Sequence, residues 1–239
     1  MIPRIYTPSE LAENTHVELE KSTSAHLQKV LRMKKGETLV AFNGDGDDYF
    51  SKIMSVGKTL TICVEERREN KCESPLHITL VQGISRGDRM DFAIQKSVEL
   101  GVSAIQPLIT EKSSVRINAD RVDKKVRHWQ SVVNSACEQS GRSIVPAVNT
   151  PVTLSDWLLK STDPFLLLAP GASKSIAALD KLASFTVAVG PESGFSETEV
   201  NAMTSAGATL VSLGPRVLRT ETAAAAAISA LQTLYGDFR

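Results

Sequence analysis

Short apolar runs alternate with amphipathic stretches along the chain beyond residue 75. The apolar runs predict buried strands, and the stretches with apolar residues every three or four positions predict helices. The predicted strands cover residues 77–82, 104–109, 165–168, 185–189 and 208–213. The predicted helices cover residues 88–100, 119–140, 153–159, 197–205 and 222–235. This alternation indicates an α/β fold with a mostly parallel sheet covered by helices.

The first 70 residues show a different pattern, in which short β-type runs follow one another. These runs predict strands over residues 2–7, 38–42, 49–56 and 59–65. The NGDG sequence at 43–46 predicts a hairpin turn between two of them. One helix is predicted over residues 24–32, with an apolar face at Leu27, Val30 and Leu31.

A polar segment at residues 66–75 separates these two patterns and ends in a proline. Such a segment predicts a linker. We therefore expect a small β-rich domain over residues 1–72 and an α/β domain over residues 73–239.

Composition narrows the class of protein. The chain has 239 residues with 27 Lys+Arg against 27 Asp+Glu, so no overall charge draws it toward a polyanion. The N-terminal residues lack the apolar stretch of a signal peptide, and no apolar run approaches the roughly 18–20 residues of a membrane span. Cys63, Cys72 and Cys137 show neither metal-ligand nor disulfide spacing. We expect a cytoplasmic protein with reduced thiols, no bound metal and no membrane partner.

The sequence AVGPESGFS at residues 188–196 is the first candidate ligand-binding loop. A Gly-Pro turn signal begins at Gly190, and Gly194 permits backbone conformations that a side chain would forbid. Ser196 and Glu199 form an S-x-x-E capping box, which predicts a helix beginning just after Ser196. A strand, a tight glycine loop and a capped helix form the arrangement in which α/β proteins place a ligand.

The sequence LGPRVLRTE at residues 213–221 is a second loop of the same kind, between a short strand and an alanine-rich helix. Two such loops on consecutive strands predict one shared pocket, near Glu192, Arg216 and Arg219. The phosphate-binding patterns G-x-x-x-x-G-K-[ST] and G-x-G-x-x-G are missing, which disfavours an NTPase or a dinucleotide enzyme. Ser193 is one position too late for a nucleophile elbow, which disfavours a serine hydrolase. The residues alone indicate an α/β enzyme with a small-molecule pocket.

Two clusters of basic residues are compatible with a nucleic-acid-binding surface. Lys29, Arg32, Lys34 and Lys35 crowd one predicted helix end, where they either bind phosphates or form a solvated face. Residues 112–142 carry seven Lys/Arg against three acids, together with His128 and Trp129. That helix either presents charges and a stacking ring to RNA, or is a solvated helix with Trp129 buried in the core.

Several motifs, in the same order, resemble the ribosomal RNA small subunit methyltransferase E family of the SPOUT superfamily. They are HLQKVLR at 26–32, QKSVELGV at 95–102, ACEQSGR at 136–142, GPESGFSETE at 190–199 and LGPRVLRTETAAAAAI at 213–228. Ser193 stands where the family commonly has glycine. We expect Gly194, rather than Ser193, to take the left-handed conformation.

The resemblance implies a C-terminal SPOUT α/β trefoil-knot domain that binds S-adenosyl-L-methionine and releases S-adenosyl-L-homocysteine. It also implies an N-terminal PUA-like β-barrel that binds RNA, a homodimer, and methylation of uridine N3 in 16S rRNA of the small ribosomal subunit. The cofactor-binding residues implied are Leu168, Ala169, Pro170, Gly190, Glu192, Gly194, Leu213, Gly214, Arg216, Val217, Leu218 and Thr222. The RNA-binding residues implied are Arg4, His26, Lys29, Arg32, Lys34, Lys35, Arg86, Lys96, Arg127 and Arg142.

Two residues are candidates for the chemistry. Arg219 is the leading candidate to stabilise negative charge that develops on the uracil oxygens. It cannot be the base, because a guanidinium stays protonated. Glu192 is either a proton acceptor or a carboxylate that orients its loop. Two alternatives stay open at this point: a SPOUT enzyme with a tRNA or large-subunit target, and a non-catalytic RNA-binding assembly factor that keeps the fold.

Overall fold

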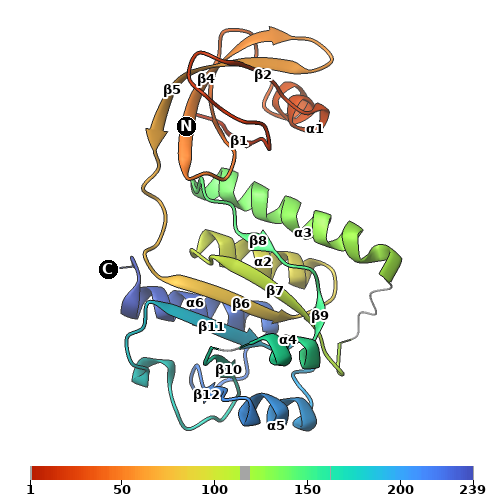
Figure 1. Ribbon diagram of the computed structural model, residues 1–239, viewed down its shortest axis with the longest axis vertical. Helices are drawn as coiled ribbons and strands as arrows, with labels where there is room; N and C mark the ends of the chain where they lie inside the picture. The colour runs from red at the N-terminus through yellow and green to blue at the C-terminus, as the bar shows by residue number, and fades with distance from the viewer. Residues whose placement is uncertain (1, 114–118, 162, 239) are drawn as a thin grey trace. The chain divides into compact units, whose positions relative to one another are not determined.

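The computed structural model describes residues 2–113, 119–161 and 163–238 (Figure 1). Contacts between residues divide the chain into two compact units. Unit 1 comprises the residues up to Glu73 together with Asn134–Val145, and unit 2 comprises Ser74–Val133 and the residues from Pro146 onward. From the sequence we expect two contiguous domains, with residues 134–145 in the second. The contacts instead group these residues with the first. Among the described residues, no helix is long and apolar enough to cross a membrane.

Unit 1 contains, within the described residues, a five-stranded sheet in the order β1-β3-β4-β5-β2. Its strands are β1 (Arg4–Tyr6), β2 (His16–Glu18), β3 (Thr38–Phe42), β4 (Asp47–Val56) and β5 (Leu60–Glu69). Strands β1 and β3 are parallel, and the other neighbours are antiparallel. Alternate residues of β5 (Leu60, Ile62 and Val64) are buried, as expected for a sheet with one face on a core.

The single helix predicted over residues 24–32 is two shorter segments, α1 (Lys21–Ala25) and a π-helical turn, η1 (His26–Val30). Leu27 is fully buried in the core of unit 1, but Val30 is 65% exposed and Leu31 is also exposed. The predicted apolar face is therefore wrong at both positions. A π-helical turn adds a residue per turn, so the 3.6-residue spacing that groups these side chains does not apply.

The predicted linker is also partly wrong, because β5 continues to Glu69 and pairs with β4 through Asp47. The end of β5 is exposed, and Arg67 and Arg68 pair there with carboxylates at the surface. An exposed strand end that carries only charged residues has the composition of a linker. Sheet pairing, which local composition does not report, decides its structure.

A partly buried network around an ion pair of the unit 1 sheet joins residues 134–145 to that sheet. Arg4 Nη1 lies 2.8 Å from Asp48 Oδ2, and both side chains are 15% exposed. Arg4 also donates to Ser143 Oγ at 2.8 Å, and Ser143 donates to Asp48. Asn70 Nδ2 donates both to Asp48 Oδ1 and to the Gly141 carbonyl. Asp48 is therefore the acceptor at the centre of this network.

We expect Asp48→Asn to lower the free energy of unfolding by about 2 kcal/mol at neutral pH, because it leaves the partly buried Arg4 charge without its carboxylate acceptor. Burial raises the pKa of the Asp48 carboxyl, but hydrogen bonds from Arg4, Ser143 and Asn70, with the Arg4 charge, outweigh burial and lower the pKa below its ordinary value. A lowered pKa contributes stability that is present above the unfolded-state pKa and is lost as the pH falls through the folded-state pKa. Denaturant unfolding at several pH values would therefore show a difference between wild type and variant that shrinks in acid.

The exposed pair of Glu66 and Arg68 provides the control, because Glu66→Gln removes a carboxylate from an ion pair that solvent screens. We expect little change in its unfolding free energy. An Asp48→Asn variant as stable as the Glu66→Gln variant at pH 7 would contradict the assigned role of Asp48.

Unit 2 contains, within the described residues, a parallel seven-stranded sheet in the order β12-β10-β11-β6-β7-β8, with β9 paired to β7. Its strands are β6 (His77–Gly83), β7 (Ala104–Ile109), β8 (Ala147–Val148), β9 (Val152–Thr153), β10 (Leu166–Leu168), β11 (Ser184–Val189) and β12 (Thr209–Val211). Its helical segments are α2 (Asp88–Glu99), the first part of α3 (Ala119–Ser140), α4 (Leu154–Lys160), the 3₁₀ turn η2 (Ile176–Ala178), α5 (Glu197–Ser205) and α6 (Thr220–Tyr235). The predicted parallel α/β fold is confirmed.

Helices cover both faces of the sheet in unit 2 (Figure 1). On one face, Val81 and Ala188 of the sheet form a core with Leu154 of α4 and Met203 of α5. On the other face, α6 contacts β6 and β11 and packs against α2. The alanines of α6 lack side-chain bulk and let this helix lie close to its neighbours. The trefoil knot that the resemblance implies stays a prediction.

Trp129 of α3 is 2% exposed. The sequence left two interpretations of the basic helix, and the burial of Trp129 confirms the one in which its ring packs in the core. His128, the neighbouring residue, is exposed and its Nε2 lies 2.8 Å from Asp91 Oδ2. Stacking of a base on Trp129 is therefore excluded in this conformation.

Candidate functional site

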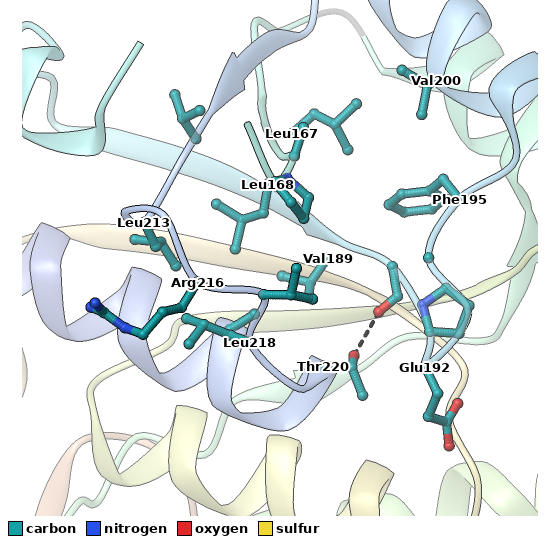
Figure 2. Close-up of a pocket in the computed structure, with 18 of the residues that line it drawn as sticks. Leu167, Leu168, Val189, Glu192, Phe195, Val200, Leu213, Arg216, Leu218 and Thr220 are labelled. Carbon is teal, nitrogen blue, oxygen red and sulfur yellow. Dashed lines mark hydrogen bonds between the residues drawn. The ribbon is translucent and has the colours of Figure 1, made fainter. Parts of the chain in front are cut away.

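A cavity of about 260 Å³ lies at the carboxyl ends of three neighbouring strands (Figure 2). Leu168 ends β10, Val189 ends β11 and Val211 ends β12, and all three line the cavity. The loops after β11 and β12 line it together, so the prediction of one shared pocket is confirmed. Because β10 lies between β11 and β12 in the sheet, the loop after β10 completes the wall between them.

Most of the predicted cofactor-binding residues come together in this cavity. Its lining includes Leu168, Ala169, Pro170, Gly190, Glu192, Gly194, Leu213, Gly214, Arg216, Val217 and Leu218. Thr222 is exposed and is not among the lining residues, which is a correction to that set. The helix α6 begins at Thr220, and Thr220 lines the cavity instead. Two residues further on, the side chain lies about 200° around the helix and faces elsewhere.

The glycine loop after β11 folds back on itself. A Cβ placed on Gly190 would lie 3.0 Å from Gly194 Cα and 3.1 Å from Phe195 N. Gly194 has φ of +68°, whereas Ser193 is not among the residues with positive φ. The expectation that Gly194 takes the left-handed conformation is confirmed, and the serine at 193 carries no backbone strain of this kind. Ser196 and Glu199 form the predicted capping box at the start of α5.

The carboxylate of Glu192 is held outside the apolar part of the cavity, and Figure 2 shows it pointing away from Val189 and Leu213. It accepts a hydrogen bond from the backbone N–H of Arg86 at 2.9 Å, and Arg89 Nη1 lies 3.3 Å from it. Burial raises the pKa of the Glu192 carboxyl. The hydrogen bonds from Arg86, from Arg89 and from its own backbone N–H, together with the positive charge of Arg89, outweigh burial and lower the pKa below its ordinary value. A lowered pKa and two committed partners favour an orienting role over a basic one.

Arg219 is the N-cap residue of α6, next to the cavity-lining Thr220, and it is exposed. Within the described part of the chain, its guanidinium forms no hydrogen bond or ion pair. It is not a cavity-lining residue, in contrast to Arg216. An exposed and uncommitted guanidinium at the edge of the cavity remains available to a second molecule.

Three residues near the cavity were not predicted from the sequence. Gln82 and Gly83 end β6, and Thr220 begins α6. A Cβ on Gly83 would lie 2.5 Å from Pro191 Cδ, so β6 and the glycine loop touch at this point. A polar residue at the carboxyl end of an apolar parallel strand was the available signal for Gln82. The approach of Gly83 to Pro191 depends on tertiary structure and has no local signal.

The basic residues predicted to bind RNA separate into two groups in unit 1. His26, Lys29, Arg32, Lys34 and Lys35 are exposed, and their contact with RNA stays a prediction.

Arg142 is buried and Arg4 is partly buried, and both are paired with carboxylates, which is a correction to the predicted RNA-binding set. Arg142 is 4% exposed, and its Nη2 lies 2.7 Å from Glu73 Oε2. Arg4 is engaged with Asp48, as described above. Both guanidiniums form ion pairs with carboxylates of unit 1, so we assign them a structural role and not a contact with a phosphate.

In unit 2, Arg86 and Arg127 are exposed. Lys96 is partly buried, and its ammonium lies 2.8 Å from Glu99 Oε1 and over the ring of the exposed Phe92. Arg86 and Arg127 are therefore more available to RNA than Lys96. In the described residues, no cluster of His, Cys, Asp or Glu has the arrangement of a metal site.

Comparison with known protein families defines the class of protein. A model described as an RNA methyltransferase domain matches residues 72–232. A model described as an RNA methyltransferase PUA domain matches residues 19–65. The parallel α/β unit and the β-rich unit therefore correspond to the two parts of an RNA methyltransferase.

The similarity to individual relatives extends over the whole chain. Ribosomal RNA small subunit methyltransferase E of Buchnera aphidicola is 38% identical over 240 residues, which cover 99% of this chain and 98% of that protein. A solved structure of the Neisseria gonorrhoeae enzyme of that name, bound to S-adenosyl methionine, is 40% identical with a TM-score of 0.93. A Legionella pneumophila methyltransferase in complex with SAM is 39% identical with a TM-score of 0.96. In both structures the match covers 100% of each chain. The chain belongs to the ribosomal RNA small subunit methyltransferase E family.

Proposed function

We propose that this protein transfers a methyl group from S-adenosyl-L-methionine to N3 of a specific uridine in 16S rRNA. The observation that carries the proposal is the convergence of the loops after β10, β11 and β12 on one cavity. Full-length relatives that are solved with this cofactor bound support it.

The residues of the cavity fit S-adenosylmethionine. Leu168, Val189 and Leu213 supply apolar walls for an adenosine, and backbone groups of the three loops supply hydrogen bonds for its polar edges. Gly190 leaves the space that a Cβ would fill, so the chain can turn closely around a ligand. When bound, S-adenosylmethionine supplies an electrophilic methyl group on its sulfonium sulfur.

The task of the protein is to position uracil N3 and to stabilise the charge that develops on the base. Uracil N3 is a weak nucleophile until its proton leaves, and the negative charge then spreads to the base oxygens. Arg219 lies at the edge of the cavity with an uncommitted guanidinium, which can donate hydrogen bonds to such an oxygen. Glu192 holds the glycine loop through Arg86 and Arg89, and we assign it the orienting role.

We assign the exposed basic residues of each unit, taken separately, to contacts with RNA phosphates. They are His26, Lys29, Arg32, Lys34 and Lys35 of unit 1 with Arg86 and Arg127 of unit 2. Phosphate contacts would position the RNA, and the chemistry at N3 would take place at the cavity.

We also propose that the enzyme works as a homodimer, on the small ribosomal subunit and in the cytoplasm. Val217 lines the cavity but is 80% exposed, and Leu234 and Phe238 are exposed near the end of the small-residue helix α6. Apolar side chains of this kind fit a second copy of the chain better than they fit water. Sedimentation at micromolar concentration would measure the oligomeric state.

The decisive experiment is methyl transfer from labelled S-adenosylmethionine to small ribosomal subunits that lack the modification. Nucleoside mass spectrometry should detect 3-methyluridine in 16S rRNA, with slower formation in RNA stripped of protein. Transfer only to tRNA or to large subunits would contradict the assigned target. Cofactor binding without transfer to any RNA would favour a non-catalytic assembly factor.

A further inference from the structure

A hydrogen-bonded trio lies at the wall of the cavity, which Gly190 and Thr220 line. Thr220 Oγ1 donates to the Gly190 carbonyl at 2.6 Å, the bond drawn as a dashed line in Figure 2. Gln82 Nε2 donates to Thr220 Oγ1 at 2.9 Å. Gln82 is fully buried, and Thr220 is 6% exposed. The three residues come from the end of β6, the start of α6 and the loop after β11.

The direction of each hydrogen bond is fixed by the groups present. The Gly190 oxygen can only accept, so the single hydroxyl proton of Thr220 points to it. The hydroxyl then accepts from Gln82, whose amide nitrogen also donates to the Gly83 carbonyl at 3.0 Å and makes a long contact of 3.5 Å to the Gly190 carbonyl. Since all of its neighbours are acceptors, the amide nitrogen of Gln82 must face them.

This arrangement leaves Gln82 Oε1 buried and, within the described residues, without a hydrogen-bond partner. A buried acceptor without a partner lowers stability, and an apolar side chain of similar size would avoid that cost. The amide therefore contributes orientation of the Thr220 hydroxyl more than stability of the core.

The trio joins the two loops that matter most for the reaction. Gly190 begins the glycine loop, and Thr220 directly follows Arg219. These loops come from β11 and β12, which are not neighbours in the sheet. The Thr220 hydroxyl thus makes a direct bond between them, and it fixes where α6 begins relative to the floor of the cavity.

We propose that Thr220 and Gln82 are positioning residues, which hold Arg219 in register with the cofactor-binding loop. The inference rests on the proposed function and deepens it. Thr220 acts through the Gly190 carbonyl and through its neighbour Arg219, and Gln82 acts through Thr220. Neither side chain needs to touch the substrate.

Thr220→Val keeps the shape of the side chain and removes the hydroxyl. It leaves the Gly190 carbonyl with only the long 3.5 Å contact from Gln82 Nε2, so we expect the Kd for S-adenosylmethionine to rise about tenfold. We expect kcat at saturating cofactor and RNA to fall by about tenfold or more, because Arg219 is displaced. Thr220→Ser restores the hydroxyl, and both quantities should return to within about threefold of wild type. Calorimetry and single-turnover methyl transfer measure them.

Thr204→Val is the matched control. Thr204 is exposed on α5, and its hydroxyl donates only within the helix, to the Val200 carbonyl at 2.8 Å. The same substitution there should leave the Kd and kcat unchanged. Gln82→Met should show a smaller form of the Thr220→Val defect, and the double variant should be no worse than Thr220→Val alone, because the two residues act in series.

Each outcome separates this inference from the proposed function. Wild-type protein that binds no S-adenosylmethionine would overturn both. A wild type that binds and methylates, beside a Thr220→Val variant that loses only thermal stability, would overturn the inference alone. A Thr220→Ser variant as defective as Thr220→Val, or additive defects in the double variant, would also overturn it.

Discussion

Replacing Arg219 with alanine is expected to reduce kcat by about 10²–10³-fold, the usual loss when one preorganised donor to a developing negative charge is removed. Arg219 is exposed at the N-cap of α6, outside the residues that line the cavity. The cavity walls should therefore survive the change, and the Kd for S-adenosylmethionine should stay within about threefold of wild type. Single-turnover methyl transfer and calorimetric titration would measure the two quantities separately.

Two further variants complete this test. Arg219→Lys keeps the positive charge but loses the planar fork of donors, so its activity should lie between those of the wild type and the alanine variant. Arg68→Ala removes an exposed arginine from the surface of unit 1 and should leave activity unchanged. Full activity in Arg219→Ala would remove this residue from the mechanism, and an equal loss of cofactor binding would assign it to the cofactor site instead.

Gly83→Ala is expected to weaken cofactor binding by about tenfold to hundredfold, which corresponds to about 1–3 kcal/mol of overpacking. The added Cβ would lie 2.5 Å from Pro191 Cδ and 2.6 Å from Pro191 N. Both atoms belong to a rigid ring, so the clash must be relieved by movement of the backbone. Because Gly190 and Pro191 line the cavity, this movement changes the shape of the site itself. Calorimetry with S-adenosylmethionine would measure the loss.

Gly57→Ala is the matched control, because a Cβ there has only the Thr59 carbonyl oxygen nearby, at an ordinary distance of 3.7 Å. Its affinity for the cofactor should equal that of wild type. If Gly83→Ala bound the cofactor as tightly as Gly57→Ala, the glycine loop would have to be free to move away from β6. The close approach described above would then not limit the site.

Elements with strong local signals could be predicted closely from the sequence. The bounds of α3 and α5 are those expected from apolar periodicity and, for α5, from the Ser196 capping box. The short strands β2, β8 and β9 were not predicted, because they lack an apolar run of the kind that marks β10 and β12. They exist through distant partners, such as Cys63 for His16 in β2.

The residues of the site also separate into those with a local sequence signal and those that depend on tertiary contacts. The glycine loops after β11 and β12 are visible in the sequence, because turn residues and a helix cap mark them. Thr222 was among the residues that the family resemblance implied, whereas Thr220, the first residue of α6, lines the cavity. The role of Gln82 could not be predicted, because its hydrogen bond to Thr220 depends on the tertiary approach of β6 to α6. The sequence around Arg142 is that of an exposed basic residue, and its burial follows from the ion pair with Glu73, which is distant in the sequence.

The grouping of residues 134–145 with the N-terminal sheet has a consequence for dissecting the protein. A fragment that ends at Glu73 would lack Ser143, which Arg4 contacts, and Glu138, which accepts the Tyr6 N–H at 2.9 Å. Unit 1 is thus encoded by two separated stretches of the gene. Exchanging this unit between family members requires both stretches to be transferred together, since a single cut in the polar segment after β5 would separate the sheet from residues that hydrogen-bond to it.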